Sequence, residues 1–142
     1  PPRSTPLYSS AASDVYKRQQ YALARMLEAS TNGEFNFVKV TSEYGKRADK
    51  VKEIFLKYGF QQVYKKDMDE PVGNGFYLTM SYPGYDGNDL MLELLRYGIS
   101  TITLKSTGST RHEGLRVCIS FIELEQMSTL ERKLQKFMEN HK

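Results

Sequence analysis

Apolar residues recur at steps of three and four along several parts of this chain, which is the spacing of one helix face. The clearest case predicts a long helix between Phe35 and Tyr58, with an apolar stripe of Phe37, Val40, Tyr44, Ala48, Val51, Phe55 and Tyr58. Shorter helices are predicted over Tyr21–Ala29, over Asp89–Tyr97 with Leu90, Met91, Leu94 and Leu95 inward, and over Glu125–Glu139. Gly59 and Gly98 suit the left-handed residue that ends a helix.

Elsewhere apolar and polar residues alternate, which is the pattern of half-buried strands. Strands are predicted over Gln61–Lys65, Gly75–Tyr82, Ile99–Leu104 and Gly114–Phe121, with a polar turn at Asp67–Asn74 and a loop at Lys105–Gly114. The order is helix, two strands, helix, two strands, helix. It predicts an α+β fold, in which a small mixed or antiparallel sheet of about four strands is covered by helices.

The first nineteen residues differ from the rest of the chain. Residues 1–10 are rich in proline and serine and show no periodicity, and residues 11–19 resemble translated adapter sequence. A segment of this kind offers too little apolar surface to offset the entropy lost on ordering it. We therefore expect residues 1–19 to be a disordered leader foreign to the protein.

Composition narrows the classes of function. The chain has 142 residues, a formal net charge of +3 and a single cysteine, so an internal disulfide is excluded. No apolar run approaches the roughly 20 residues of a membrane span. We expect a cytoplasmic protein with no metal site, because one cysteine and two distant histidines do not make a zinc centre. The long helix carries basic residues on one face, which we expect to be solvated. A domain that binds nucleic acid through this face is the alternative.

The strand Gly114–Phe121 contains the principal candidate for chemistry. Its alternation places Leu115, Val117, Ile119 and Phe121 on one face and turns Arg116 to the other. An arginine among aliphatic residues is costly to bury unless it meets an anion, and its planar fork of donors fits a carboxylate or a phosphate. A salt bridge within the chain, or an edge-strand arginine that reaches into solvent, is the structural alternative.

Other reactive residue types fit structural or solvated roles better. Cys118 is interpreted as a packing residue, because no base or helix terminus is predicted beside it. His112 lies in a polar loop and His141 near the end of the chain, and both are expected to be solvated. Arg111 is an alternative partner for a second carboxylate, but its loop position favours solvent. No phosphate-binding loop and no nucleophile elbow occurs in the sequence.

Several segments together resemble the C-terminal small domain of the class I/II aminotransferases, which are fold type I pyridoxal-phosphate enzymes. They are Gly75-Phe76-Tyr77-Leu78, Arg96-Tyr97-Gly98-Ile99, Ser106-Thr107-Gly108-Ser109-Thr110 and Glu113-Gly114-Leu115-Arg116-Val117-Cys118-Ile119-Ser120. The resemblance covers about residues 20–142. It implies that residues 20–34 are a remnant of the large domain, and that residues 35–142, beginning with the long interdomain helix, are the small domain.

The resemblance also implies roles. Arg116 matches the arginine that binds the α-carboxylate of the substrate, and Gly75 matches a glycine that lines the cleft between the domains. The implied substrates are an amino acid and a 2-oxo acid, and the implied intact enzyme is a homodimer. The Schiff-base lysine and the other residues that bind pyridoxal phosphate belong to the family's large domain. The resemblance therefore implies no catalytic or cofactor-binding residue here, and an isolated chain that is inactive. A non-catalytic α+β module that binds a small molecule or regulates an enzyme is the alternative.

Overall fold

The computed structural model describes residues 7–73 and 75–141, with side chains from Lys17 onward. The chain divides into two compact units between Val40 and Thr41. The first contains helix α1, Leu7–Thr31, which is longer than the predicted helix Tyr21–Ala29. Its N-terminal part covers residues that we expected to lack regular structure, while residues 1–6 lie outside the described part of the chain. The division into leader, remnant and small domain stays a prediction.

Helix α2, Phe37–Lys57, corresponds to the predicted long helix. The Asn36 side chain accepts a hydrogen bond from the backbone N–H of Lys39 (3.0 Å), which satisfies a free donor of the first turn. The helix ends as predicted at Gly59, whose φ is +88°. Phe60 then turns back onto the last helical turn, with its ring centroid 5.0 Å from that of Phe55.

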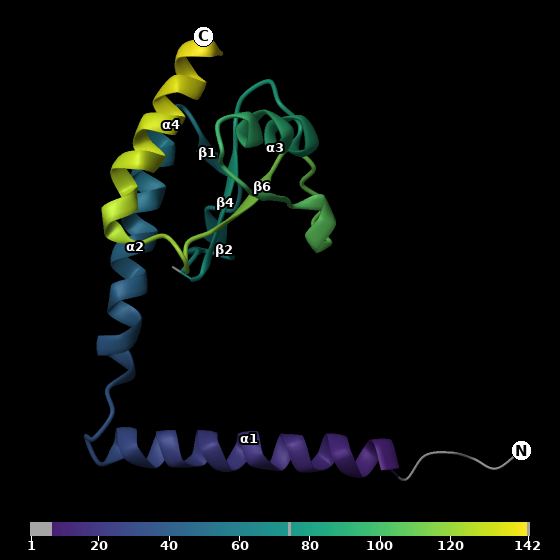
Figure 1. Ribbon diagram of the computed structural model, residues 1–142, viewed down its shortest axis with the longest axis vertical. Coiled ribbons are helices and arrows are strands. Elements are labelled where there is room, and N and C mark those ends of the chain that lie inside the picture. The colour runs from purple at the N-terminus through teal and green to yellow at the C-terminus, as the bar shows by residue number, and fades with distance from the viewer. Residues whose placement is uncertain (1–6, 74, 142) are drawn as a thin grey trace, which may run out of the picture. The chain divides into compact units, whose positions relative to one another are not determined.

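A four-stranded antiparallel sheet forms the centre of the second unit (Figure 1). Its order is β1 (Gln61–Gln62), β4 (Tyr77–Ser81), β6 (Leu115–Cys118) and β5 (Ile102–Thr103), so all the strands are shorter than predicted. The predicted polar turn is instead a small hairpin of β2 (Lys66–Asp67) and β3 (Glu70–Pro71). Asn74, the last residue of that predicted turn, lies outside the described residues.

The helices cover one face of this sheet. Helices α2, α3 (Gly87–Arg96) and α4 (Met127–Asn140) bury their apolar sides in one core with the inward residues of β4 and β6. These inward strand residues are Leu78, Met80, Leu115 and Val117. Two 3₁₀ turns, Lys105–Thr107 and Leu124–Gln126, precede β6 and α4. The α+β class predicted from the sequence is confirmed.

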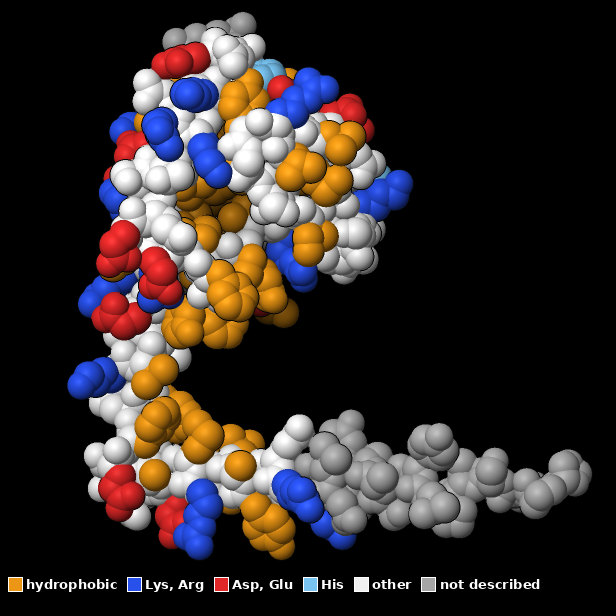
Figure 2. All heavy atoms as spheres, viewed as in Figure 1, with side chains coloured by type: hydrophobic (Ala, Val, Ile, Leu, Met, Phe, Trp, Pro, Cys, Tyr) orange, Lys and Arg blue, Asp and Glu red, His pale blue; other side chains and the backbone are white. Residues whose placement is uncertain are grey.

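Three residues that were predicted to lie on apolar faces are in fact exposed, and one of them is Val40 of the long helix, at 49%. Phe121 is 89% exposed, because β6 ends at Cys118 and the chain turns directly after Ile119. Leu95 is also exposed, since α3 faces the core through Leu90 and Leu94 and each further residue rotates by about 100° around the helix. Met91 is only half-buried. Figure 2 shows that apolar side chains gather in patches on the visible face of the second unit.

The end of α4 packs in an aromatic cluster, and here the expectation of a solvated His141 was wrong. The His141 ring stacks on Phe137 with centroids 4.4 Å apart, and its Nε2 lies 3.3 Å from Glu93 Oε1. Tyr85 and Tyr97 contact the same histidine ring edge-on. Burial in this cluster raises the pKa of the Tyr85 hydroxyl above its ordinary value. His112, in contrast, is exposed as predicted.

We predict that Gly87→Ala destabilises the second unit by about 1–3 kcal/mol, the usual cost of overpacking. A Cβ atom on Gly87 would lie 2.7 Å from the carbonyl oxygens of His112 and Gly114, which cannot rotate away. Urea unfolding followed by circular dichroism measures the change. Gly45→Ala is the matched control, because a Cβ there meets nothing within 4 Å. The control is expected to be neutral or stabilising, and equal stabilities of both variants would contradict the packing described.

A second prediction concerns acid stability. Glu131 on α4 accepts hydrogen bonds from Lys57 Nζ and, at 3.3 Å, from the Tyr58 hydroxyl on the α2 side. The hydrogen bond and the charge of Lys57 lower the pKa of Glu131. The folded state thus favours the ionised form of Glu131, and this stabilises the fold at pH values above the ordinary carboxyl pKa of about 4.3. The stabilisation is lost as the pH falls through the lowered pKa of Glu131 in the folded state.

Glu131→Gln is therefore expected to lower the melting temperature at pH 7, and the difference from the wild type should shrink below about pH 4. Thermal unfolding between pH 3 and pH 7 measures this. Lys57→Met should show the same dependence, and combining the two substitutions should add little. A difference from the wild type that is independent of pH would contradict the ion pair.

Candidate functional site

Arg116 lies in the middle of the sheet, on the face that the helices leave open. Its direct cross-strand partners are Thr79 on β4 and Ile102 on β5, so β6 is an interior strand. The alternative of an edge-strand arginine is therefore wrong. Direct partners in an antiparallel sheet project to the same side, and the inward residues Leu115 and Val117 flank Arg116 in sequence. Their burial against the helices turns the guanidinium to the open face.

The guanidinium of Arg116 rests on an aromatic ring. Its central carbon is 4.4 Å from the ring centroid of Tyr77, a cation–π arrangement. The Arg116 side chain is half-buried, while Tyr77 is 51% exposed. Among residues 17–73 and 75–141, whose side chains are described, no carboxylate forms an ion pair with Arg116. A planar fork of donors on an open sheet face, supported from one side by a ring, can accept an external carboxylate.

Arg47 forms a salt bridge within the chain, which was the structural alternative considered for Arg116. This other half-buried arginine pairs with Glu123, at 2.7 Å between Nη2 and Oε2, and its cation also lies over the ring of Tyr44. Glu123 precedes the 3₁₀ turn before α4, so this pair ties α2 to the start of α4. A structural arginine of this chain thus has its carboxylate, and Arg116 has none in the described residues.

The other residues singled out from the sequence lie apart from one another. Gly75 is exposed, precedes β4 and lies four residues before Thr79, the direct partner of Arg116. Cys118 shares the open face with Arg116, but it is exposed rather than packed, with its Sγ 3.1 Å from Ser120 Oγ. The interpretation of Cys118 as a packing residue was therefore wrong. Tyr77, which contacts Arg116, was missed because the register of β4 against β6 cannot be read from the sequence.

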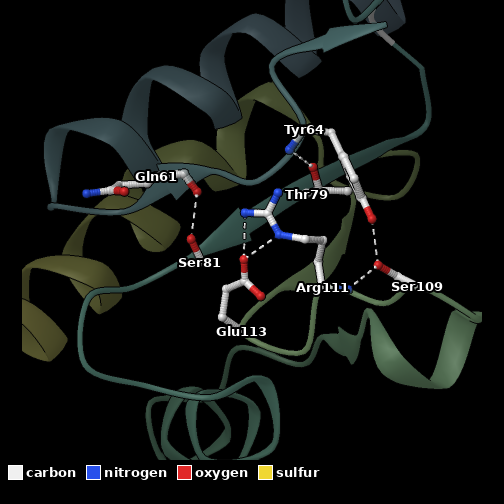
Figure 3. A network of polar contacts seen from close by, with 7 residues as sticks. All are labelled: Gln61, Tyr64, Thr79, Ser81, Ser109, Arg111 and Glu113. Atoms are coloured by element: carbon white, nitrogen blue, oxygen red, sulfur yellow. Dashed lines mark hydrogen bonds and ion pairs between the residues drawn. The ribbon is translucent and has the colours of Figure 1, made fainter.

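A polar network covers the part of the open face next to Thr79 (Figure 3). The backbone N–H of Tyr64 donates to Thr79 Oγ1 (3.2 Å), and the Tyr64 hydroxyl shares a hydrogen bond with Ser109 Oγ (2.6 Å). Ser109 Oγ also accepts from the backbone N–H of Arg111 (3.0 Å). These contacts fix the loop before β6 to the strand that pairs with Arg116.

Arg111 is held within the same network. Its Nη2 and Nε both donate to Glu113 Oε1, at 2.6 and 2.7 Å. The backbone and the Arg111 guanidinium lower the pKa of Glu113, so this carboxylate stays ionised and keeps its partner occupied. Arg111 is thus exposed, as the solvated interpretation predicted, and it is also paired with Glu113 in this structure.

The loop that resembles an aminotransferase segment uses its hydroxyls internally. Ser106 Oγ donates to the Thr103 carbonyl and Thr107 Oγ1 to the Leu104 carbonyl, both at 2.7 Å. A hydroxyl that donates to a backbone carbonyl does not at the same time donate its proton to a phosphate group. The described residues also contain no group of three or more His, Cys, Asp or Glu side chains placed to hold a metal ion. None of the helices described is long and apolar enough to cross a membrane.

The basic face of α2 is largely neutralised by acidic partners. Lys46 pairs with Glu43 and Lys50 with Glu53 within the helix, each at 2.9 Å. Lys57 and Arg47 pair with residues near or on α4. Such pairs reduce the local positive charge that a phosphate backbone would meet. They favour the solvated interpretation of this face.

No protein-family model matches the sequence, and no curated protein matches it. Among solved structures, the fold is similar to that of the kynurenine aminotransferase of Pyrococcus horikoshii, solved in complex with PMP, KYN as substrates and KYA as products. The TM-score is 0.55 over 72% of this chain, with 11% sequence identity. The likeness shows the fold. The chain spans 25% of the length of that aminotransferase.

Proposed function

We propose that this chain is the C-terminal small domain of a pyridoxal-phosphate-dependent aminotransferase, and that Arg116 binds the α-carboxylate of the substrate. The fold likeness to part of an aminotransferase supports the family. One observation carries the role of Arg116: its guanidinium lies on the open face of an interior strand, on the Tyr77 ring, without a carboxylate partner in the described residues.

Arg116 would act by holding and orienting its ligand. Two parallel N–H donors of the guanidinium bind the two oxygens of a carboxylate, which fixes both the position and the rotation of that group. A fixed carboxylate restricts the orientation of the neighbouring Cα–H bond, and positioning of this kind lowers a barrier by removing rotational freedom in advance. The Tyr77 ring supports the cation from one side and leaves its donor edge for the ligand.

The cofactor would be bound outside this chain. When bound, pyridoxal phosphate supplies an electron sink for amino-group transfer between an amino acid and a 2-oxo acid. We propose that none of the residues described here forms its site, and the hydroxyls of the Ser106–Ser109 loop, which bond to the chain itself, support this. We further propose that the intact enzyme is a cytoplasmic homodimer, and that the isolated chain is inactive.

The test is a substitution series in the full-length enzyme that contains this segment. Arg116→Met should raise KM for the amino acid by at least 30-fold, because loss of a bound charge partner costs about 2–5 kcal/mol. Arg116→Lys should recover only part of the loss, since an ammonium cannot reproduce the fork. Steady-state kinetics with a monocarboxylic amino acid measures both effects.

Arg111→Met is the matched control, because Arg111 is already paired with Glu113. It should change KM for the same amino acid less than threefold. Unchanged kinetics in Arg116→Met would remove the carboxylate role, and a full-length protein without aminotransferase activity would overturn the family.

A further inference from the structure

The free edge of β4 borders a cavity next to the contact between Tyr77 and Arg116. Strand β1 pairs with Ser81 and Met80, and the Val63 N–H adds a backbone bond to the Thr79 carbonyl, so the Tyr77–Leu78 part of this edge has no neighbouring strand in the described residues. The β2–β3 hairpin and the residues after it face this edge instead. Together they enclose about 330 Å³, lined by Gln62, Tyr64, Lys66, Asp67, Val72, Gly73, Tyr77, Leu78 and Thr79.

Two residues connect this cavity to Arg116. Tyr77 lines the cavity and carries the guanidinium on its ring. Thr79 also lines the cavity and is the direct cross-strand partner of Arg116. A second cavity of about 380 Å³, beside the end of β6, shares only Cys118 with the open strand face, and the ammonium of Lys133 there already donates to the Gly98 carbonyl (2.6 Å). Of these two cavities, the one at the β4 edge is therefore the one that is lined by residues that contact Arg116 or pair with it.

The lining indicates what the cavity would accept. Tyr64, Tyr77, Val72 and Leu78 provide apolar and aromatic walls. The backbone N–H and C=O of Tyr77 point to the same edge as those of Thr79, whose carbonyl accepts from the Val63 N–H (3.0 Å). Lys66 and Asp67 bring one charge of each sign, so the lining has no net preference for a charged group. A volume near 330 Å³ lies at the lower end of the roughly 300–1,000 Å³ typical of small-molecule pockets.

We propose that this cavity is a side-chain subsite for the carboxylate ligand of Arg116, and that it selects ligands whose carboxylate is joined to a flat apolar body. The proposal rests on the carboxylate role of Arg116 given above. With the carboxylate on the guanidinium, the body of the ligand passes the Tyr77 ring and lies between Tyr64, Tyr77 and Val72. Aromatic amino acids and aromatic 2-oxo acids are the substrate class with this shape.

The test uses the 142-residue chain and two probes, acetate and 3-phenylpropanoate, titrated by NMR in a buffer without other carboxylates. The wild type should bind 3-phenylpropanoate at least fivefold more tightly than acetate. The Tyr64 and Tyr77 ring signals should shift with 3-phenylpropanoate and show contacts to its phenyl protons. This readout needs no substitution. Val72→Phe fills the cavity and should remove the preference for 3-phenylpropanoate while leaving acetate binding unchanged.

Leu92→Phe is the matched control, because Leu92 is exposed on α3 and does not line this cavity; it should change neither affinity. If both probes need Arg116 but bind equally, with no phenyl contact to Tyr64 or Tyr77, the subsite is overturned while the carboxylate role of Arg116 stands. If Arg116→Met binds both probes like the wild type, the carboxylate role and the subsite are overturned together.

Discussion

Burial of the inner side of β6 is the constraint on which the rest of the structure depends. Leu115, Val117 and Ile119 lie in the core against the helices, with at most 4% of any of them exposed. Burying each side chain of this size stabilises the fold by about 1.5–3 kcal/mol, so the strand cannot rotate without losing the core. Because side chains alternate along a strand, Arg116 is fixed on the opposite face. Its orientation is a consequence of packing and not of any contact that it makes itself.

That fixed orientation distinguishes Arg116 from a surface arginine. Most long side chains on a surface can reach several acidic partners, whereas Arg116 starts from an interior strand with Thr79 and Ile102 on either side. The Tyr77 ring occupies one side of the guanidinium and limits its rotation further. A cation–π contact leaves the in-plane N–H groups available, while an ion pair such as Arg111 with Glu113 uses them. The two arginines of the open face therefore differ in the donors that they offer, although they share the same net charge.

The sequence predicted the elements that depend on local pattern. The α+β class, the long helix, the glycine at its end and the direction of Arg116 all follow from periodicity over a few residues. Predictions that extended a local pattern past its end, or that depended on distant parts of the chain, failed or were missing. Phe121 was taken as inward because the alternation was extended past the turn after Ile119. His141 was taken as solvated because its ring partners, Phe137, Tyr85 and Tyr97, come together only through packing of α3 against α4.

The same reasoning explains why the cavity beside Arg116 was not foreseen. The cavity exists because β1 is only two residues long. The part of the β4 edge that β1 does not pair with therefore faces the β2–β3 hairpin. The alternation over Gln61–Lys65 suggested a longer strand, which would have paired with that edge and closed it. Tyr64 instead leaves the ladder, and its backbone N–H bonds to the hydroxyl of Thr79. The backbone pairing between these two segments ends with the bond from the Val63 N–H to the Thr79 carbonyl (3.0 Å). The space next to the contact between Arg116 and Tyr77 thus results from where β1 ends.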